Sequence, residues 1–369
     1  MLLLLTCSGW SASIPTPKPP SINANSYILI DHHTHRIVAQ KNADVRNDPA
    51  SITKLMTAYI VYKALAQNSI NLEDQVLVSE KAWRAPGSRM FIEVGKRVSV
   101  ENLLQGLIVQ SGNDASIALA EYVAGSEAAF VDLMNAEASV LGLQNTHFMN
   151  VTGLTDPQHF TTARDIALLS SALIGNFPKQ YKRYSIKEFT FNNITQHNRN
   201  KLLWRDPSVD GLKTGHTKAA KYCLAASAQR SGMRLISVVL GAPSSDARAT
   251  QSQSLLNYGF RFFETHKIYD QNNEIIEKRV WYGAEKILPL GVADSVYVTI
   301  ARGQYAHIEP HLEIKTKLVA PIEKGQVVGK VVIKLADENL AEVDLIALEH
   351  IQEGSLVRKI SDYIKGYFE

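Results

Sequence analysis

Three short strings occur in a fixed order along this chain, and together they limit what it can fold into. The strings are Ser51-Ile52-Thr53-Lys54, Ser111-Gly112-Asn113 and Lys213-Thr214-Gly215, and the first and third occur once each. Residues far apart in the sequence must meet if the three strings form one site. Each string alone is short enough to arise by chance, so their order and local context carry the argument.

The first string stands where a helix is predicted to begin. Pro49 suits the first turn of a helix, and the apolar side chains that follow recur at helical spacing, at Ile52, Leu55, Met56, Tyr59, Ile60 and Leu65. Ser51 and Lys54 are three residues apart and would lie on one face of this helix. The positive end of the helix dipole at Ser51 would stabilise an oxyanion beside it.

This serine and lysine predict nucleophilic catalysis. A serine hydroxyl needs a base to take its proton, and a lysine can be that base once its pKa falls toward neutrality. Burial among apolar neighbours lowers a lysine pKa, and so does a second cation, for which Lys213 is the candidate. We therefore predict that Ser51 is the nucleophile and that Lys54 is its base.

The second string lies in a predicted turn between two helical stretches, residues 100–109 and 114–124. Gly and Asn are common in such turns. The Ser111 hydroxyl can pass a proton between Lys54 and a leaving amine, and the Asn113 amide can donate to or accept from a substrate peptide. We predict a catalytic role for Ser111 and a substrate-binding role for Asn113.

The third string leads into a predicted β-hairpin made of residues 222–228 and 234–240. A strand edge can bind an extended peptide through backbone hydrogen bonds, and Gly215 would let that backbone approach closely. The side chains of Lys213 and Thr214 can bind a carboxylate. This segment is therefore predicted to bind substrate.

With these three strings, the chain resembles the low-molecular-mass penicillin-binding proteins, the serine D-Ala-D-Ala carboxypeptidases of the peptidase S11 type. The similarity to the family's sequences continues in residues 109–116, 210–217 and 258–265. It covers the chain from about residue 25 to its end. It implies removal of the terminal D-alanine from peptidoglycan pentapeptide stems through an acyl-enzyme on Ser51. It also implies acylation and inhibition by penicillins and other β-lactams, and no cofactor.

The resemblance also assigns roles within the site. Ser51, Lys54 and Ser111 would be catalytic, and the backbone N–H groups of Ser51 and His216 would form an oxyanion hole. The substrate-binding set would be Asn113, Lys213, Thr214, Gly215, His216 and Arg248. Arg248 would help to hold the substrate carboxylate, because a guanidinium can form two parallel hydrogen bonds with that anion. Arg199 would support the site from behind.

Two other functions remain open at this point. A class A β-lactamase would use a glutamate to activate water, but no Glu-x-x-Leu-Asn string follows Ser111. A catalytically silent cell-wall-binding scaffold would not need the intact serines and lysines of the three strings. Release of D-alanine from a pentapeptide, together with slow turnover of the drug, would separate these functions.

The expected fold class is α/β. The resemblance implies a penicillin-binding/β-lactamase-like α/β sandwich, an antiparallel sheet with an inserted helical cluster, over residues 25–265. The pattern agrees, with a hairpin at 27–30 and 37–39, a helical block from 51 to about 173, strands at 189–191 and in the later hairpin, and a helix at about 247–263. Residues 81–90 form a predicted loop that could border the active site.

Two further segments follow the catalytic domain. Residues 266–353 contain short alternating or apolar runs separated by Gly and Pro, which predict a small all-β domain. Residues 354–369 predict an amphipathic helix, with apolar Leu356, Val357, Ile360, Ile364, Tyr367 and Phe368 and cationic Arg358, Lys359 and Lys365. This helix is too short and charged to span a bilayer but can lie on an anionic membrane surface. The alternative is a terminal helix docked on its own domain.

The N-terminal residues 1–24 predict a signal or leader sequence and a Pro-rich spacer. An apolar stub precedes Ser11-Ala12-Ser13, a candidate cleavage site. A lipoprotein interpretation would use Cys7, although Thr6 is a poor residue before such a cysteine. Export and the terminal helix together predict peripheral anchoring at the periplasmic face of the cytoplasmic membrane.

Composition limits the remaining possibilities. The net charge of +3 is mild and the chain has no basic cluster, so no nucleic-acid partner is expected. Cys7 and Cys223 are the two cysteines, and Cys7 lies in the leader, so no disulfide framework is expected. The three histidines His32, His33 and His35 fall in a predicted turn without acidic or cysteine partners, so no metal is expected.

Overall fold

The computed structural model describes residues 16–315 and 317–365. It divides into two compact units, of which one is Pro19–Arg261 and the other is built on Phe262–Glu369. The predictions for the leader, including Cys7, and for Tyr367 and Phe368 lie outside the described residues.

An antiparallel five-stranded sheet forms the frame of the first unit, in the order β2-β1-β9-β8-β7. Its strands are β1 (Ser26–Asp31), β2 (Ile37–Lys41), β7 (Val209–Thr217), β8 (Lys221–Arg230) and β9 (Met233–Ala242). Strands from both ends of the unit thus pair, as the predicted sandwich requires. The strand that carries Lys213-Thr214-Gly215 lies at one edge of this sheet.

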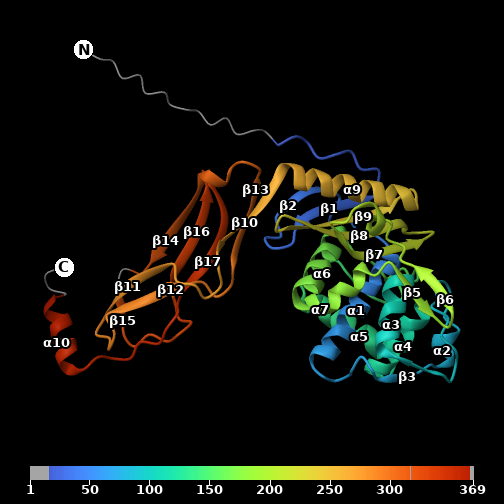
Figure 1. Cartoon of the computed structure of the whole chain (residues 1–369), viewed down its shortest axis with the longest axis horizontal. Coiled ribbons are helices and arrows are strands. Elements are labelled where there is room, and N and C mark those ends of the chain that lie inside the picture. The colour runs from blue at the N-terminus through green and yellow to red at the C-terminus, as the bar shows by residue number, and fades with distance from the viewer. Residues whose placement is uncertain (1–15, 316, 366–369) are drawn as a thin grey trace, which may run out of the picture. The chain divides into compact units, whose positions relative to one another are not determined.

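Both faces of the sheet are covered by helices (Figure 1). Alternate residues of a strand point to opposite faces. In β1 and β9, Ile28 and Ile236 join the core of the helical cluster, whereas Leu29 and Leu235 face Gly259 of α9 (Ser245–Phe262). The two buried faces explain why β8 and β9 read as nearly continuous apolar runs.

The helical cluster is inserted between β2 and β7. Its helices are α1 (Lys54–Ala66), α2 (Glu80–Trp83), α3 (Val100–Gln105), α4 (Asn113–Ala124), α5 (Glu127–Val140), α6 (Ala163–Asn176), α7 (Pro178–Tyr181) and α8 (Leu202–Arg205). Single turns at Ala50–Thr53, Gly106–Gln110 and Lys182–Ser185 complete it. Two small ribbons, β3 (Gln75–Leu77) with β4 (Arg97–Ser99) and β5 (Glu188–Phe191) with β6 (Ile194–His197), lie within the same region.

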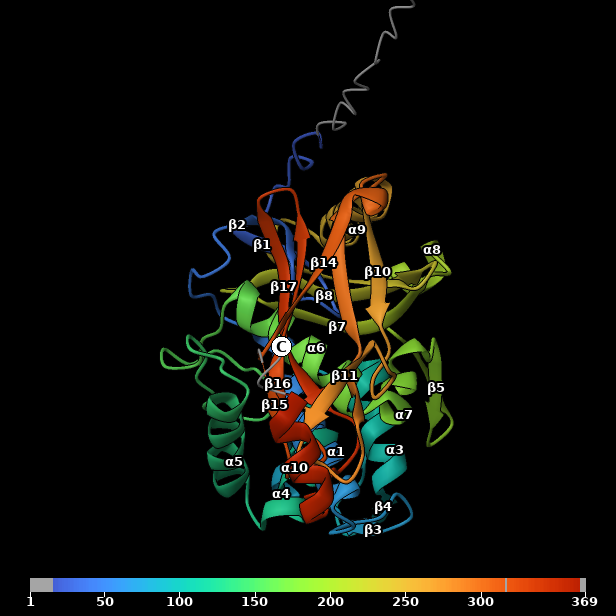
Figure 2. The same cartoon turned by 90° about the vertical axis from the view of Figure 1, so that its left-hand side faces the viewer.

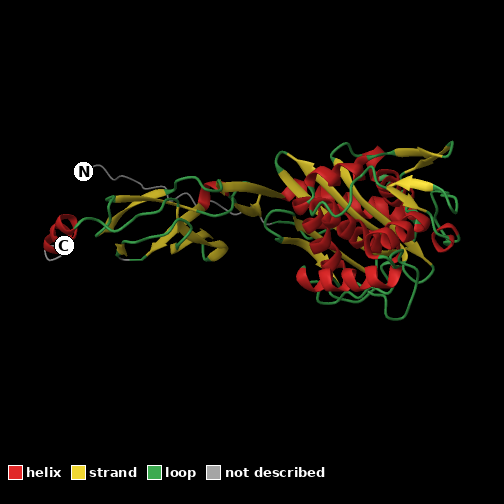
Figure 3. Ribbon diagram, turned by 90° about the horizontal axis from the view of Figure 1, so that it is seen from below, coloured by secondary structure: helices red, strands yellow, loops and turns green. Residues whose placement is uncertain are grey.

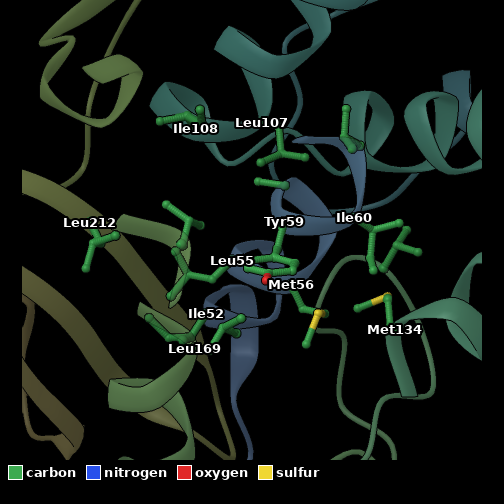
Figure 4. Packing of buried hydrophobic residues seen from close by; sticks show 14 of the residues in the cluster. Ile52, Leu55, Met56, Tyr59, Ile60, Leu107, Ile108, Met134, Leu169 and Leu212 are labelled. Carbon is green, nitrogen blue, oxygen red and sulfur yellow. The ribbon is translucent and has the colours of Figure 1, made fainter. Parts of the chain in front are cut away.

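Helix α1 runs through the middle of this cluster and is buried on every side from Lys54 to Tyr62. Figure 4 shows its apolar side chains packed against Leu107, Met134, Leu169 and Leu212 from four other segments. The sequence pattern predicted one apolar face. Burial on all sides fits the near absence of polar residues along this helix.

The fold class is confirmed, and two local predictions need correction. The helical block 51–173 is interrupted by the β3–β4 ribbon. The stretch predicted as one helix over 100–109 ends as α3 at Gln105 and continues as a π-helical turn, Gly106–Gln110. Such turns often occur at functional sites, and this one leads directly to Ser111.

The second unit is built mainly from strands, as Figure 3 shows. A six-stranded sheet has the order β14-β16-β17-β12-β11-β15, and β10 pairs with β13. The bounds are β10 (Phe263–Tyr269), β11 (Ile276–Trp281), β12 (Ile287–Gly291), β13 (Val296–Ala301), β14 (Ile308–Ile314), β15 (Leu318–Val319), β16 (Val327–Leu335) and β17 (Glu338–Ala347). The unit starts slightly before the predicted boundary at residue 266.

Helix α10 (Leu356–Lys365) ends the described chain, next to β11 and β15 (Figures 1 and 2). Its Asp362 is buried, at 1% exposed, and accepts a hydrogen bond from Tyr282 N at 2.9 Å. Its apolar residues face solvent, with Leu356 and Val357 each 78% exposed. No helix among the described residues is long and apolar enough to cross a membrane.

Candidate active site

The nucleophile candidate and its base meet at the start of α1. Ser51 lies in a 3₁₀ turn, Ala50–Thr53, and the α-helix begins only at Lys54, so the predicted helix start at Ser51 was wrong by one turn. The two side chains still meet, with Lys54 Nζ 3.1 Å from Ser51 Oγ. Ala50 has a φ of +46°, a conformation that costs free energy for a residue other than glycine.

Lys54 is fully buried and has two further oxygen neighbours. Its Nζ donates to Thr152 O at 2.6 Å and to Asn113 Oδ1 at 2.7 Å. A neutral amine has two N–H groups, which these oxygens satisfy, and its lone pair then faces Ser51 Oγ. Burial lowers the pKa of Lys54 to about 7, helped by the positive charge of Arg199 and opposed by Asp114. Arg199 therefore has the charged role that the sequence suggested for Lys213.

The Thr152 carbonyl was not predicted, and the loop that supplies it is built by two other residues. Asn150 Oδ1 accepts hydrogen bonds from the backbone N–H groups of Thr152, Gly153 and Leu154. Gly153 has a φ of +84°, and a Cβ there would lie 1.8 Å from Ala50 O. The loop and the nucleophile turn are thus in direct backbone contact, which only glycine allows.

Ser111 and Lys213 form a second serine–lysine pair. Lys213 Nζ donates to Ser111 Oγ at 2.8 Å and to Thr214 O at 3.0 Å. Lys213 is only 2% exposed and lies behind Ser111, and its predicted part in binding the substrate carboxylate stays a prediction. Burial, followed by the charge of Lys54, lowers the pKa of Lys213 well below its usual value. Ser111 has a φ of +65°, which turns its side chain toward this lysine at the end of the π-helical turn.

The Asn113 amide is mostly engaged within the protein. Besides accepting from Lys54, it donates through Nδ2 to Pro86 O at 2.6 Å. Its second Nδ2 hydrogen can donate to a substrate carbonyl. Next to it, the Asp114 carboxylate accepts from the backbone N–H groups of Met90, Phe91 and Ile92. Asp114 therefore holds the loop after α2 against the Ser111 turn, a role that the sequence did not reveal.

Gly215 allows a close backbone approach within the chain itself. A Cβ at this position would meet Pro49 O at 3.0 Å and Ala50 Cβ at 3.1 Å. This close approach is between β7 and the nucleophile turn of the same chain, and the approach of a substrate backbone at Gly215 stays a prediction. This contact places Ser51 beside the edge strand.

An open cleft of about 450 Å³ brings the accessible members of the site together. It is lined by Ser51, Ser111, Thr214, Gly215, His216, Arg199, Arg248, Gln110 and the loop residues Gly87, Ser88, Arg89 and Phe91. Of the predicted bordering loop, residues 81–90, the first three residues belong to α2, and Gly87, Ser88 and Arg89 border the cleft. Arg248 is buried on the β8 side, where Nη1 donates to Gly215 O at 2.8 Å, and burial lowers its pKa to about 10.

Other candidate residues are engaged elsewhere. His32 and His35 contact Ser171 Oγ at 2.9 and 2.8 Å, and the described residues contain no group of His, Cys, Asp or Glu that could hold a metal ion. Cys223 is buried in β8 behind the cleft, and burial raises its pKa to about 11. A thiol with a raised pKa is a poor nucleophile, in line with the predicted inert role.

Comparison with known proteins identifies the family. A family model described as D-alanyl-D-alanine carboxypeptidase matches residues 13–244, and one described as the penicillin-binding protein 5 C-terminal domain matches residues 263–353. The chain belongs to the D-alanyl-D-alanine carboxypeptidase family. It is a hydrolase of the serine peptidase type, which confirms the resemblance stated above.

Individual relatives of this carboxypeptidase match nearly its whole length. The D-alanyl-D-alanine carboxypeptidase DacC of Escherichia coli is 45% identical, with 97% of this chain and 91% of that protein covered. The structure of penicillin-binding protein 5 from Haemophilus influenzae matches with a TM-score of 0.86 at 43% identity, over 91% of this chain and 100% of the other.

A shorter relative is known with a drug bound. The structure of penicillin-binding protein D2 from Listeria monocytogenes in its ampicillin-bound form matches with a TM-score of 0.61 at 30% identity. It covers 66% of this carboxypeptidase and 100% of that chain.

Proposed function

We propose that this carboxypeptidase removes the terminal D-alanine from peptidoglycan pentapeptide stems through an acyl-enzyme on Ser51. The observation that carries the proposal is the contact between Ser51 Oγ and a buried Lys54 whose pKa is lowered to about 7. Neutral Lys54 takes the hydroxyl proton while Ser51 Oγ attacks the carbonyl carbon of the penultimate D-alanine. The backbone N–H groups of Ser51 and His216 stabilise the oxyanion.

The leaving amine needs a proton, and the second pair is suited to deliver it. Ser111 lines the cleft and accepts from Lys213 Nζ, so its own hydroxyl proton can pass to the amine while protonated Lys213 replaces it. This modifies the role expected from the sequence, in which Ser111 linked Lys54 to the amine directly. D-Alanine then leaves, and water hydrolyses the ester on Ser51. In this step Lys213 takes a proton from the attacking water, and Lys54 returns its proton to Ser51 Oγ.

The proposed binding groups for the terminal carboxylate are Lys213, Thr214 and Arg248. Thr214 and Arg248 line the cleft on the β7–β8 side, and Lys213 lies behind Ser111. The substrate would lie extended along the free edge of β7, with Asn113 donating to a carbonyl on the acyl side. β-Lactams, which carry a carboxylate beside a strained amide, would occupy the same groups and acylate Ser51. Ampicillin binding by the Listeria relative supports this part of the proposal.

The site of acylation is directly testable. The full-length protein is labelled with a fluorescent penicillin, digested and mapped, alongside Ser51→Ala and release of D-alanine from an acetylated pentapeptide. The expected result is label on the peptide that contains Ser51 and no label on the variant. Label on another peptide would contradict the assignment, as would fast penicillin turnover, which would favour the β-lactamase alternative. Absence of both activities would favour the wall-binding scaffold.

We also propose that α10 anchors the enzyme to an anionic membrane surface at the periplasmic face after export by the leader. A terminal helix docked for stability would bury its apolar face, but here Asp362 is the buried residue and the apolar residues are exposed. Of the three cations expected to attract lipid, Arg358 lies 3.6 Å from Asp362 and Lys359 2.6 Å from Glu353. Apolar contact would therefore dominate over charge.

A further inference from the structure

The cleft contains an arginine that the proposed mechanism does not use. Arg89 is half-buried and lines the same cleft as Ser51. Its guanidinium donates to Trp83 O at 3.4 Å and lies over the Phe91 ring at 5.4 Å. Within residues 16–315 and 317–365 no carboxylate pairs with it, whereas Arg84 on the same loop pairs with Glu80 at 2.7 Å.

The charges around the cleft leave Arg89 without an assigned partner. Three arginines line it, Arg89, Arg199 and Arg248, and its described lining contains no aspartate or glutamate. Arg248 is proposed to bind the terminal carboxylate, and the charge of Arg199 lowers the pKa of the two buried lysines. Solvent reaches this half-buried guanidinium in the open cleft, and its one hydrogen bond to the protein is long, so an anionic group of the substrate can replace water on it.

The backbone on both sides of Arg89 is fixed, which sets where that anion would lie. Ser88 O accepts from Asn113 N at 2.6 Å, and Met90 N donates to the Asp114 carboxylate at 3.0 Å. Arg89 O itself accepts from Gln196 Nε2 at 3.1 Å. The arginine is thus held on the wall beside Asn113, and not on the β7 wall that carries Thr214. A preorganised cation of this kind loses little entropy when it binds an anion.

We infer that Arg89 is a specificity-determining residue that binds a second carboxylate of the peptide, carried by the side chain of the residue before D-Ala-D-Ala. The inference rests on the proposed function, because it assumes that the acyl side of the peptide lies along the Asn113 wall. The enzyme would then prefer stems whose third residue ends in a carboxylate over stems whose third residue is neutral.

An isosteric substrate pair tests this preference. The substrates are N-acetyl-L-2-aminopimelyl-D-Ala-D-Ala and the same peptide with its side-chain carboxylate converted to a carboxamide. A charge-assisted hydrogen bond at a partly exposed site should favour the acid by roughly tenfold in kcat/KM. Arg89→Met should bring the acid-to-amide ratio close to one, and Arg89→Lys should keep part of it. Arg84→Met, the matched control on the same loop, should keep the wild-type ratio.

The outcomes separate the two proposals. Equal rates for acid and amide in the wild-type enzyme would overturn the inference alone, because D-alanine release would still support the proposed function. Equal slowing of both substrates by Arg89→Met, with the ratio retained, would show a structural role and also overturn it. Failure of the wild-type enzyme to release D-alanine from either peptide would overturn both.

Discussion

Helices α1 and α10 both bury a charged side chain, but they do so in opposite surroundings. In α1, Lys54 is fully buried on a helix that is itself buried on every side from Lys54 to Tyr62. In α10, Asp362 is buried while the apolar residues around it face solvent, with Ile360 60% and Ile364 54% exposed. The buried cation of α1 has its pKa lowered, whereas the buried anion of α10 is held by a backbone N–H and two arginines.

This difference shows two outcomes of burying a charged group, which by itself raises the free energy of the folded protein. Burying a charge without a counter-charge is unfavourable, and the lysine responds by releasing its proton near neutral pH. The result is a base. Burying a charge with partners fixes an orientation instead, and in α10 that orientation turns an apolar surface outward. The four experiments below test the comparison, starting with the largest expected effect.

Lys54→Arg should abolish general-base catalysis by the buried side chain of α1. Arginine keeps the positive charge but does not lose its proton, so the variant cannot act as a general base. Removing general-base catalysis should slow acylation by about 10²–10⁴-fold. The measurement is the rate of penicillin acylation by stopped-flow, with thermal unfolding as a control for folding. Near-normal acylation in a folded variant would assign the base elsewhere.

The same lysine should make stability depend on pH. Its pKa is about 7 in the folded state and 10.5 when exposed, so between these values the unfolded chain binds more protons. The free energy of unfolding should therefore rise with pH across this window, by at most about 1.4 kcal/mol per pH unit from this group. Acylation should rise with pH through a midpoint near 7.

Urea unfolding of the wild-type protein and of Lys54→Met at several pH values measures this rise. In Lys54→Met the free energy of unfolding should rise less with pH than in the wild-type protein. Lys63→Met removes an exposed lysine of α1 that pairs with Glu137, and it should keep the wild-type rise. Equal slopes for the wild-type protein and Lys54→Met would mean that Lys54 is protonated in the folded protein across the window.

Truncation after Glu353 removes α10 with its exposed apolar residues and should leave α1 unchanged. Full burial of one apolar side chain of α10 would contribute about 1.5–3 kcal/mol to the free energy of membrane binding. Insertion at the membrane interface is shallower, so each side chain contributes less than this. Partitioning onto anionic vesicles should fall by roughly tenfold or more. Hydrolysis of a small soluble peptide should stay the same. If both forms partition equally at low and high salt, α10 is a docked terminal helix.

Asp362→Ala should have the smallest effect. It removes the acceptor for Tyr282 N, and a hydrogen bond of this kind contributes about 1 kcal/mol. Amide hydrogen exchange in α10 should become faster while the exchange of β16 and β17 stays unchanged. Glu353→Ala, which removes the surface pair with Lys359, is the control and should change exchange less. Equal exchange in all three proteins would mean that Asp362 does not orient the helix.

Local spacing was enough to predict some parts of the site. Ser51 and Lys54 were found because two residue types three positions apart define their own geometry in a helical turn. The strand with Thr214 was found because its apolar hairpin partners follow directly in sequence. The fold class followed from strands at both ends of a helical block, which can only pair with each other if the block is inserted.

Other parts of the site left no signal in residue type or spacing. The oxygen that Lys54 contacts at 2.6 Å is a backbone carbonyl of Thr152, and any residue could supply it. The only trace in the sequence was Asn150 and Gly153, which suit a turn. The burial of Asp362 depends on Tyr282, which is too distant in sequence for helical periodicity to reveal. The contact of Gly215 with the nucleophile turn was not predicted, because the packing partner comes from another segment.

The position of β7 at the sheet edge has a consequence for solubility. An exposed strand edge offers unpaired N–H and C=O groups that can join copies of a protein into larger assemblies. Here the 3₁₀ turn Ala50–Thr53 packs against β7, and the residues of the strand that line the cleft are Thr214, Gly215 and His216. Contact with this turn leaves less of the edge strand open to pairing between copies of the protein.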